Sequence, residues 1–365
     1  MSGGARAEAA DGSSGEPAAG LPGGRWSASD LRRYRGLRPG DRIAVVAPSG
    51  PADPARLEAG CAVLRDLGLD VVVGKHALDR VNLGAPGPLR DDWHRLAGGD
   101  ADRAADLEAA WCDPRVRAVV CARGGYGATR VLDHLDWDAL AAAAREAGRA
   151  GTGPKILHGS SDITALHVAF GARLGVTTSF GPMPAGRVAD LAAASHLADT
   201  PRPPDAADAE TFEGLRAALF REDQSPLTGT HALCEGSAEG PLTGGTLTLL
   251  TALLGTPYAP PPAAGRVVLL EDVSEAPYRI DRMLVQLLQA GWFDGAAGVV
   301  LGSWERSGDP AELDAVFAAR LGPLGVPVLA GAPVGHGPRQ RTLELGAPVR
   351  LDAGALTLRA PGGAR

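Results

Sequence analysis

The chain of 365 residues is poor in lysine, aromatic residues and cysteine. Only two of its 36 basic residues are lysines, Lys75 and Lys155, the formal net charge is −7, and no basic run occurs. Because binding to a phosphate backbone needs clustered cations, this composition argues against a nucleic-acid partner. No apolar run approaches the ~20 residues that cross a bilayer, which argues against a membrane protein.

The four cysteines are too few and too widely spaced for a metal site of the usual kind. Cys61, Cys112, Cys121 and Cys234 show no Cys-x-x-Cys spacing, and three of them lie within apolar segments. We therefore expect buried free thiols and no bound metal.

The residues that are abundant indicate a globular protein of two domains. Apolar residues make up 45% of the chain, and the 50 glycines and 29 prolines are dispersed between periodic apolar segments, where they mark turns. Residues 1–24 are small and polar without an apolar core, so we expect a disordered tail, not a signal peptide, and a cytoplasmic protein. We expect an N-terminal domain over residues 25–189, an Ala-, Pro- and Asp-rich connection over 190–228, and a C-terminal domain over 229–365. In the C-terminal domain, the Gly-Gly pair within residues 240–255 reads as a turn leading into an apolar helix, and residues 342–345 read as one of the short strands that finish the domain.

The N-terminal domain begins with a pattern typical of an α/β fold. Arg42 to Pro48 reads as a buried strand, Pro54 to Leu67 as a helix and Leu69 to Val73 as a second strand. A strand, helix and strand in this order predict a parallel sheet with right-handed crossovers. Ser49-Gly50 would then lie at the carboxyl end of the first strand, where such sheets bind ligands.

A glycine-rich loop follows a later strand of this domain. Val116 to Ala122 reads as the strand, and Arg123-Gly124-Gly125-Tyr126-Gly127 leaves it. Consecutive glycines let the backbone approach a ligand and turn its N–H groups inward, as an oxyanion hole or anion nest requires. On its own the loop is explained equally well as a tight turn.

Ser161 occupies the most informative position in the sequence. Ile156 to His158 reads as a strand end, Gly159 permits a turn, and Asp162 to Leu174 has apolar residues at nearly helical spacing. The serine hydroxyl would therefore lie at a helix N-terminus, near free N–H groups that could stabilise an oxyanion. The plain alternative is a helix cap, since Ser and Asp are ordinary capping residues.

Two further strand ends carry groups that could complete a hydrolytic triad. Glu271-Asp272 follows the strand Arg266 to Leu270, and His336 lies between two glycines. With Ser161 they would supply a nucleophile, an acid and a base, although a solvated strand end and a turn histidine explain them separately. His158 is the nearest rival base, but its position on the strand should point its side chain into the packing of the sheet.

Together these segments resemble the LD-carboxypeptidase family of serine peptidases over about residues 40–352. The resemblance rests on five motifs that occur in the family's order. They are Arg123-Gly124-Gly125-Tyr126-Gly127, Gly159-Ser160-Ser161-Asp162-Ile163-Thr164, Gly244-Gly245-Thr246-Leu247-Thr248-Leu249-Leu250, Leu270-Glu271-Asp272-Val273-Ser274-Glu275 and Gly335-His336-Gly337.

The resemblance implies a flavodoxin-like N-terminal domain with a parallel sheet and a C-terminal α+β domain with a β-rich core. It also implies a cytoplasmic homodimer that releases the terminal D-alanine of murein tetrapeptide by hydrolysing an L-D bond, without a metal or cofactor. The nucleophile would be Ser161, the acid Glu271 and the base His336. Backbone N–H groups of Asp162 and of Gly124 or Gly125 would form the oxyanion hole.

Several assignments stay open. Glu275 competes with Glu271 for the role of the acid. Ser160 replaces an aromatic residue that is usual in the family and Phe180 replaces a frequent histidine, which leaves the substrate preference open. Two other functions are a hydrolase that detoxifies peptide-nucleotide or acyl-sulfamoyl antibiotics and a peptide-binding module without activity. The candidate substrate-binding residues are Arg123, Tyr126, Ser160 and Arg279, with Arg282 as a further candidate for the terminal carboxylate.

Overall fold

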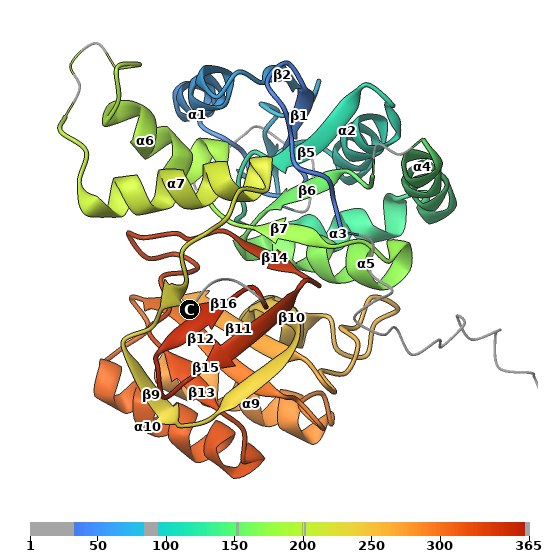
Figure 1. The fold of residues 1–365 in the computed structure, drawn as a ribbon. Helices are drawn as coiled ribbons and strands as arrows, with labels where there is room; N and C mark the ends of the chain where they lie inside the picture. Colours follow the sequence, from blue (N-terminus) through green and yellow to red (C-terminus); the bar gives the residue numbers. More distant parts are fainter. Residues whose placement is uncertain (1–32, 84–93, 151–152, 199, 201, 362–365) are drawn as a thin grey trace, which may run out of the picture.

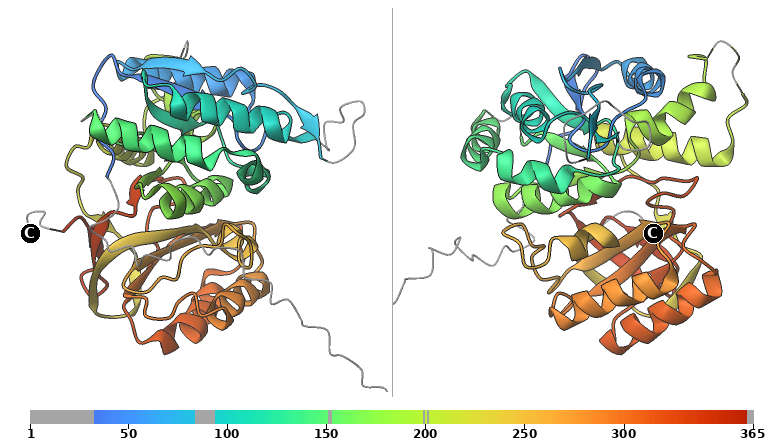
Figure 2. Two further views of the ribbon diagram at one scale, coloured as in Figure 1. Left: turned by 90° about the vertical axis from the view of Figure 1, so that its right-hand side faces the viewer. Right: turned by 180° about the vertical axis from the view of Figure 1, so that it is seen from behind.

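The computed structural model describes residues 33–83, 94–150, 153–198, 200 and 202–361. The chain forms two stacked parts, each built on its own sheet (Figure 1), and the same stacking is seen from the side and from behind (Figure 2). The predicted tail over residues 1–24 lies outside the described residues. The predicted α/β class, with a parallel sheet in one part and a β-rich core in the other, is confirmed.

The first sheet has six strands in the order β14-β7-β6-β5-β1-β2, of which all but β14 run parallel. These strands are β1 (Arg42–Val46), β2 (Asp70–Val73), β5 (Val116–Cys121), β6 (Ile156–Gly159), β7 (Thr178–Phe180) and β14 (Leu343–Leu345). The parallel order places the carboxyl ends of β1, β5 and β6 at one edge, as the sequence predicts.

Strand β14 is the exception, because we expected residues 342–345 to finish the C-terminal domain. It pairs antiparallel with β7 instead. Glu344 explains the preference, since its carboxylate forms an ion pair with Arg33 at 2.6 Å and accepts a hydrogen bond from the Thr177 hydroxyl at 2.7 Å. The pairing covers the edge of β7, which would otherwise expose unpaired backbone groups.

Helices cover both faces of the first sheet. Helices α2 to α5 share one buried cluster with the sheet, and α1, α6 and α7 share the other. Their bounds are α1 (Pro54–Asp66), α2 (Asp100–Cys112), α3 (Ala128–Val131), α4 (Trp137–Arg149), α5 (Thr164–Leu174), α6 (Ala189–Ala193) and α7 (Ala206–Phe220). Although α7 falls within the predicted connection, its residues Leu215 and Leu219 pack into the second cluster.

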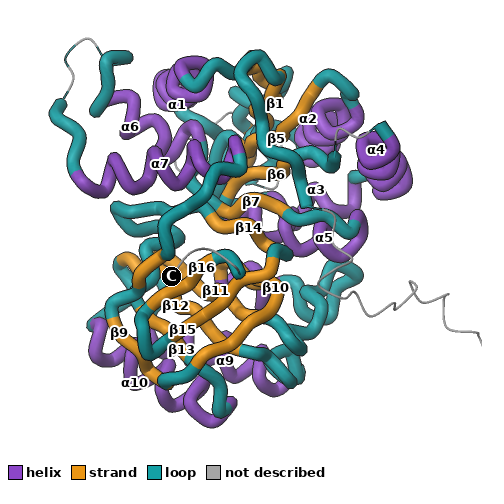
Figure 3. The backbone as a smooth tube through the Cα atoms, in the orientation of Figure 1, coloured by secondary structure: helices purple, strands orange, loops and turns teal. Residues whose placement is uncertain are grey.

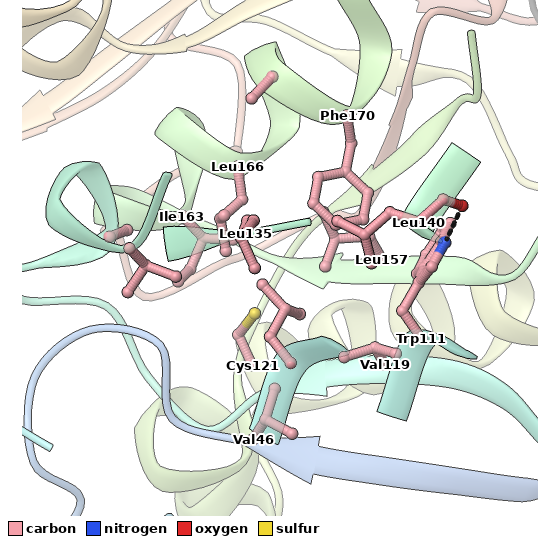
Figure 4. Close-up of a cluster of buried hydrophobic side chains, with 14 of the residues drawn as sticks. Val46, Trp111, Val119, Cys121, Leu135, Leu140, Leu157, Ile163, Leu166 and Phe170 are labelled. Carbon is pink, nitrogen blue, oxygen red and sulfur yellow. Dashed lines mark hydrogen bonds between the residues drawn. The ribbon is translucent and has the colours of Figure 1, made fainter. Parts of the chain in front are cut away.

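Large apolar side chains fix the helices that flank the nucleophile segment (Figure 4). Trp111 of α2 meets Phe170 of α5 edge to face, with ring centroids 4.8 Å apart, and its indole N–H donates to the Leu140 carbonyl at 3.1 Å. Ile163 and Leu166 extend this cluster toward Cys121 on β5. Burial of these side chains therefore anchors the helix that follows Ser161.

The second sheet has eight strands in the order β8-β16-β15-β10-β11-β12-β13-β9 (Figure 3). Strands β10 to β13 run parallel, while β9, β15, β16 and β8 are antiparallel to their neighbours. The strands are β8 (Leu227–Thr228), β9 (His231–Cys234), β10 (Ser237–Thr246), β11 (Val267–Val273), β12 (Gly298–Glu305), β13 (Val328–Ala330), β15 (Pro348–Asp352) and β16 (Thr357–Arg359).

Three helices cover one face of this sheet. They are α8 (Leu247–Ala252), α9 (Pro277–Gln289) and α10 (Pro310–Leu321). The other face buries Leu269 and Val300 against Phe180 of β7 and Leu345 of β14. The two sheets therefore share apolar contacts, which holds their facing strand ends together.

Strand β10 differs from the sequence-based expectation of a turn at Gly244-Gly245. Both glycines continue the strand with positive φ angles of 115° and 134°. A Cβ on Gly244 would lie 2.0 Å from the Leu269 carbonyl oxygen, and one on Gly245 would lie 2.6 Å from Oγ1 of Thr164. The glycines thus allow β10 to approach both β11 and the start of α5.

Two strands lie outside the two large sheets. Strands β3 (Val81–Asn82) and β4 (His94–Leu96) form a separate pair. The expectation of buried thiols holds for Cys61 and Cys121. It is wrong for Cys112, which is exposed at the end of α2, and for Cys234, which is only half-buried. Within the described ranges, no helix combines the length and the apolar character needed to cross a membrane.

Candidate active site

Ser161 lies where β6 turns into α5, in a left-handed backbone conformation. Its φ angle is 61°, and a 3₁₀ turn over Ser161–Ile163 leads directly into the helix. A positive φ is unusual for a residue with a side chain and costs conformational energy, as in the strained turns that present nucleophiles. The predicted sharp turn is therefore present, although the helix itself begins at Thr164 rather than at Asp162.

The structure brings Ser161, His336 and Glu271 together. Nε2 of His336 lies 3.0 Å from Oγ of Ser161, and Nδ1 lies 2.7 Å from Oε2 of Glu271. An ionised carboxylate only accepts hydrogen bonds, so Nδ1 carries the proton and Nε2 is left as an acceptor for the serine hydroxyl. This is the geometry that general-base activation of a serine requires.

Backbone contacts hold the imidazole in place. Oγ of Ser303 accepts hydrogen bonds from the N–H groups of His336 at 2.7 Å and of Gly337 at 3.0 Å. At Gly335, where φ is 110°, a Cβ would lie 2.3 Å from Oε2 of Glu271. Glycine is therefore needed at that position for the loop to approach the carboxylate.

Glu271 and Glu275, which the sequence leaves as alternatives, lie in different surroundings. Glu271 is fully buried within β11, two residues before its end, and its Oε1 accepts a hydrogen bond from the Thr246 hydroxyl. The Glu275 carboxylate instead lies 3.7 Å from Arg279 at the start of α9. Only Glu271 contacts His336, so the geometry favours it as the acid.

The environment of His336 affects its protonation in opposing ways. Burial lowers the pKa of His336, while the hydrogen bond and the charge of Glu271 and the charge of Asp272 raise it, and the net direction is upward from the ordinary value. A raised pKa makes the imidazole a stronger proton acceptor.

The glycine loop after β5 lies against the serine. A Cβ on Gly124 would be 3.0 Å from Oγ of Ser161 and 3.3 Å from the backbone nitrogen of Asp162. Gly125, with a φ of 114°, instead faces Gly50. Of the two glycines that the sequence could not separate, Gly124 is the one next to the hydroxyl.

The Asp162 side chain joins three strand ends, a role that the sequence did not reveal. Its buried Oδ2 accepts hydrogen bonds from the Ser49 hydroxyl at 2.5 Å and from the Ala128 N–H at 2.7 Å. Buried Arg103 links the same two loops by donating to the carbonyl oxygens of Pro48 and of Gly127, the latter at 2.9 Å. In the sequence, only the position of Ser49 at a strand end indicated that it could contact the nucleophile segment.

The four predicted substrate-binding residues differ in their surroundings. Arg123 is exposed and donates to the Pro51 carbonyl at 3.2 Å, and Tyr126 is also exposed. Ser160 is buried beside the nucleophile. Arg279 lies at the start of α9 against Tyr278 and Glu275.

A hollow of about 500 Å³ adjoins the histidine loop. Its lining includes Ser303 and Gly337, which adjoin the histidine, together with Trp304, Phe317, Arg306 and Arg339. None of Ser161, Glu271 and His336 lines this hollow, so it lies beside the triad and not over the serine hydroxyl.

Two other predicted features concern alternatives to the triad. His158 is buried, with Nδ1 2.9 Å from the Ser179 hydroxyl and Nε2 2.7 Å from the Pro182 carbonyl oxygen, so it points into the packing as expected. In the part of the chain that the structure describes, no cluster of three or more His, Cys, Asp or Glu side chains could hold a metal ion.

Comparison with known families agrees with this arrangement. Residues 43–181 match the LD-carboxypeptidase N-terminal domain, and residues 239–351 match the LD-carboxypeptidase C-terminal domain. This chain belongs to the LD-carboxypeptidase family. Ser161 lies within the first matched region, and Glu271 and His336 lie within the second.

Curated relatives cover nearly the whole chain. A Streptomyces coelicolor protein with a provisional carboxypeptidase name is 48% identical over 91% of this chain and 97% of its own length. The murein tetrapeptide carboxypeptidase of Pseudomonas aeruginosa is 31% identical over 86% of this chain and 94% of its own. At the level of the family, these relatives support a peptidase, and hence a hydrolase.

Solved structures share the fold. The muramoyltetrapeptide carboxypeptidase of Oxalobacter formigenes superposes with a TM-score of 0.67 at 26% identity, over 87% of this chain and 97% of that one. MccF in complex with glutamyl sulfamoyl guanosine gives a TM-score of 0.73 at 23% identity, over 91% and 98% of the two chains. The second likeness concerns the fold alone.

Proposed function

We propose that this protein is a serine-type carboxypeptidase that hydrolyses the L-D peptide bond before the terminal D-alanine of murein tetrapeptide, in peptidoglycan recycling. The observation that carries the proposal is the continuous hydrogen-bonded chain from Ser161 through His336 to Glu271. The 31% identical murein tetrapeptide carboxypeptidase supports the choice of substrate.

In the first step, Nε2 of His336 accepts the proton of the Ser161 hydroxyl while Oγ attacks the carbonyl carbon. The imidazolium that forms is stabilised by Glu271, which also fixes the tautomer. Collapse of the tetrahedral intermediate breaks the C–N bond, and the imidazolium returns its proton to the departing amine of D-alanine. The shortened peptide is left as an ester on Ser161.

In the second step, water attacks this ester. His336 takes a proton from the water, and the acyl–Oγ bond then breaks as the proton returns to Ser161. The products are the shortened peptide with a new carboxylate and the restored serine.

During both steps, the negative oxygen of the intermediate needs hydrogen-bond donors. We assign this role to the backbone N–H groups of Asp162 and Gly124, because a Cβ on Gly124 would lie 3.0 Å from Oγ of Ser161 and 3.3 Å from the nitrogen of Asp162. Loss of one such donor is expected to cost roughly 10²–10³-fold in rate. The tie between Asp162 and the loop at Ala128 supports a fixed spacing between these donors.

A second candidate is hydrolysis of peptide-nucleotide or acyl-sulfamoyl antibiotics, because MccF, a structural neighbour, has been solved with glutamyl sulfamoyl guanosine. The two functions share the triad and differ in the leaving group. A peptide-binding module that lacks turnover is the third outcome to distinguish.

The experiment is to incubate purified protein with murein tetrapeptide and, separately, with an aminoacyl sulfamoyl nucleoside, beside the Ser161→Ala variant. The proposal expects release of D-alanine by the parent, with a loss of roughly 10⁴-fold or more in kcat/KM for the variant. Turnover of the nucleoside conjugate alone would favour the second candidate. Binding without turnover of either substrate would favour the module.

The homodimer and the cytoplasmic location that the family resemblance implies stay predictions. Sedimentation velocity at several protein concentrations tests the first, and cell fractionation tests the second. A protein that sediments as a monomer throughout would contradict the dimer.

A further inference from the structure

We infer that Thr246 is a positioning residue that orients the charged carboxylate of Glu271 and ties it to the segment that carries the nucleophile. The inference rests on the proposed function for its meaning, but it concerns a residue to which the proposed mechanism gives no part.

The first observation is the direct contact between the two side chains. Thr246 and Glu271 are partners across the parallel pair β10 and β11, and the Thr246 hydroxyl donates to Oε1 of Glu271. Both residues are buried, with exposed fractions of 3% and 0%. The other carboxylate oxygen, Oε2, accepts the N–H of His336. Each oxygen of the carboxylate thus has its own donor, which fixes the plane of the carboxylate relative to the imidazole.

The second observation is that Thr246 is hydrogen-bonded to the part of the molecule that is built on the first sheet. Its backbone N–H donates to Oγ1 of Thr164 at 3.1 Å, and Thr164 directly follows the 3₁₀ turn of Ser161. The contact is close because Gly245 has no side chain, since a Cβ there would lie 2.6 Å from the same Oγ1 atom. The position of the Thr246 hydroxyl is therefore set by the segment that presents the nucleophile.

These contacts form one path from the acid to the nucleophile that does not pass through the histidine. Glu271 contacts Thr246, Thr246 contacts Thr164, and Thr164 lies three residues after Ser161. Because of these contacts, a movement of the two parts of the molecule away from each other would displace the Glu271 carboxylate as well as the Ser161 hydroxyl. We therefore expect Thr246 to affect the basicity of His336, not only the stability of the fold.

The charged groups that face the His336 ring must be considered for any effect of pH. They are Glu271 and Asp272 from β11 and Arg306 from the residues after β12, while Ser161 contributes its hydroxyl. Removal of the Thr246 hydroxyl leaves one oxygen of the buried carboxylate without its donor, so the plane of the carboxylate is no longer fixed relative to the imidazole. Since the carboxylate stabilises the imidazolium only when it faces the ring, the pKa of His336 should fall.

A neighbouring pair provides a matched control. The Thr248 hydroxyl donates to Oδ2 of Asp272 at 2.8 Å, so it also pairs a threonine with a buried carboxylate. Asp272 keeps two further donors, the N–H groups of Thr248 and Val273, each at 2.8 Å. Thr248→Val therefore removes the same chemical group two residues away, without removing a contact of Glu271.

The test measures the pKa of His336 directly, from the pH dependence of its imidazole NMR signals in the Ser161→Ala background, where no substrate or turnover is needed. The signals are assigned with a His336→Gln variant. We expect Thr246→Val and Thr246→Ala to lower this pKa by about one pH unit and Thr246→Ser to retain it. Thr164→Val, which removes the acceptor of the Thr246 N–H, should lower it by less. Thr248→Val can act on His336 only through the charge of Asp272, so it should also lower the pKa by less than Thr246→Val.

The same substitutions with Ser161 intact give the kinetic readout. Thr246→Val should lower kcat about 10-fold or more with little change in KM, and Thr246→Ser should restore most of the loss. A His336 pKa and kcat that are unchanged in folded Thr246→Val and Thr246→Ala would overturn the inference, as would an equal effect of Thr248→Val. An unchanged pKa of His336 in Thr164→Val would show that the contact between Thr246 and Thr164 does not help to orient the carboxylate. If the parent hydrolysed no peptide, the proposed function would fail while the NMR result still decided the role of Thr246.

Discussion

Ser161 and His336 are 175 positions apart in the chain, yet Nε2 of the histidine lies 3.0 Å from Oγ of the serine. The serine belongs to the first sheet's part of the molecule and the histidine to the second. The reactive pair therefore depends on the packing of one part on the other, where Phe180 and Leu345 join the core of the second sheet.

Glu271→Gln should lower kcat by roughly 10³–10⁴-fold, because an amide can hold the wrong tautomer of His336 and cannot stabilise the imidazolium. Glu275→Gln should stay within about threefold of the parent, since Glu275 takes part only in a loose ion pair with Arg279. Steady-state turnover of the peptide by both variants decides between them. A larger loss for Glu275→Gln than for Glu271→Gln would show that Glu275, and not Glu271, is the acid.

The rate should rise with pH through the titration of His336. A base must be neutral to accept a proton, and the pKa of His336 lies above its ordinary value, so the midpoint of kcat/KM should exceed about pH 6.5. In Glu271→Gln, the loss of the negative charge should move this midpoint to lower pH while the plateau falls. A parent profile with its midpoint below pH 6 would contradict the raised pKa.

Gly124→Ala should lower kcat by roughly 10²-fold or more with a small effect on stability. The added Cβ would lie 2.8 Å from the Cβ of Ser161 and 3.0 Å from its Oγ, so the hydroxyl or the loop must move. Gly322→Ala is a suitable control, because no atom lies within 4 Å of its added Cβ. Rates and melting temperatures of both variants test this, and a fully active Gly124→Ala would show that the loop lies farther from the reacting atoms.

The free energy of unfolding should fall as the pH drops from about 6.5 to about 4. Burial lowers the pKa of both His158 and His167 to about 4, while an unfolded histidine titrates near 6.5, so unfolding takes up protons in this range. The loss amounts to about 3 kcal/mol for each histidine at the lower limit. Asp272, whose pKa burial raises to about 6, acts in the opposite sense, so each variant is compared with the parent.

His158→Gln tests this, because glutamine can keep both contacts of the ring, to Ser179 and to the Pro182 carbonyl, but cannot titrate. Urea unfolding near pH 7 and near pH 4.5 should show a smaller difference for the variant than for the parent. Equal differences would mean that His158 does not contribute to acid destabilisation.

The sequence predicted those features whose causes are local. The run from Ile156 to Leu174 contains a buried strand, a glycine turn and an apolar helix in succession, so the position of Ser161 at the strand-to-helix turn follows from neighbouring residues. The order of the parallel strands likewise followed from the alternation of strands and helices. The choice of Glu271 over Glu275 did not, because both follow the same strand and only the arrangement in space separates them.

Features set by distant residues were missed. Gly244 and Gly245 read as a turn because nothing near them in the sequence shows that Leu269 and Thr164 crowd the strand. Strand β14 read as part of the C-terminal domain because its partner β7 lies more than 160 positions earlier. Thr246 belongs to one of the five family motifs, but its contact with Glu271 depends on the register between β10 and β11.

The place of β14 has a consequence for how the polypeptide acquires its shape during synthesis. The strands that carry Gly124 and Ser161 are complete by residue 180, but the border of β7 is closed only by residues 343–345. A ribosome-bound chain must therefore emerge as far as residue 336 before the histidine is available, and as far as residue 345 before that border is sealed. A nascent or prematurely terminated polypeptide would carry the serine without the means to activate it.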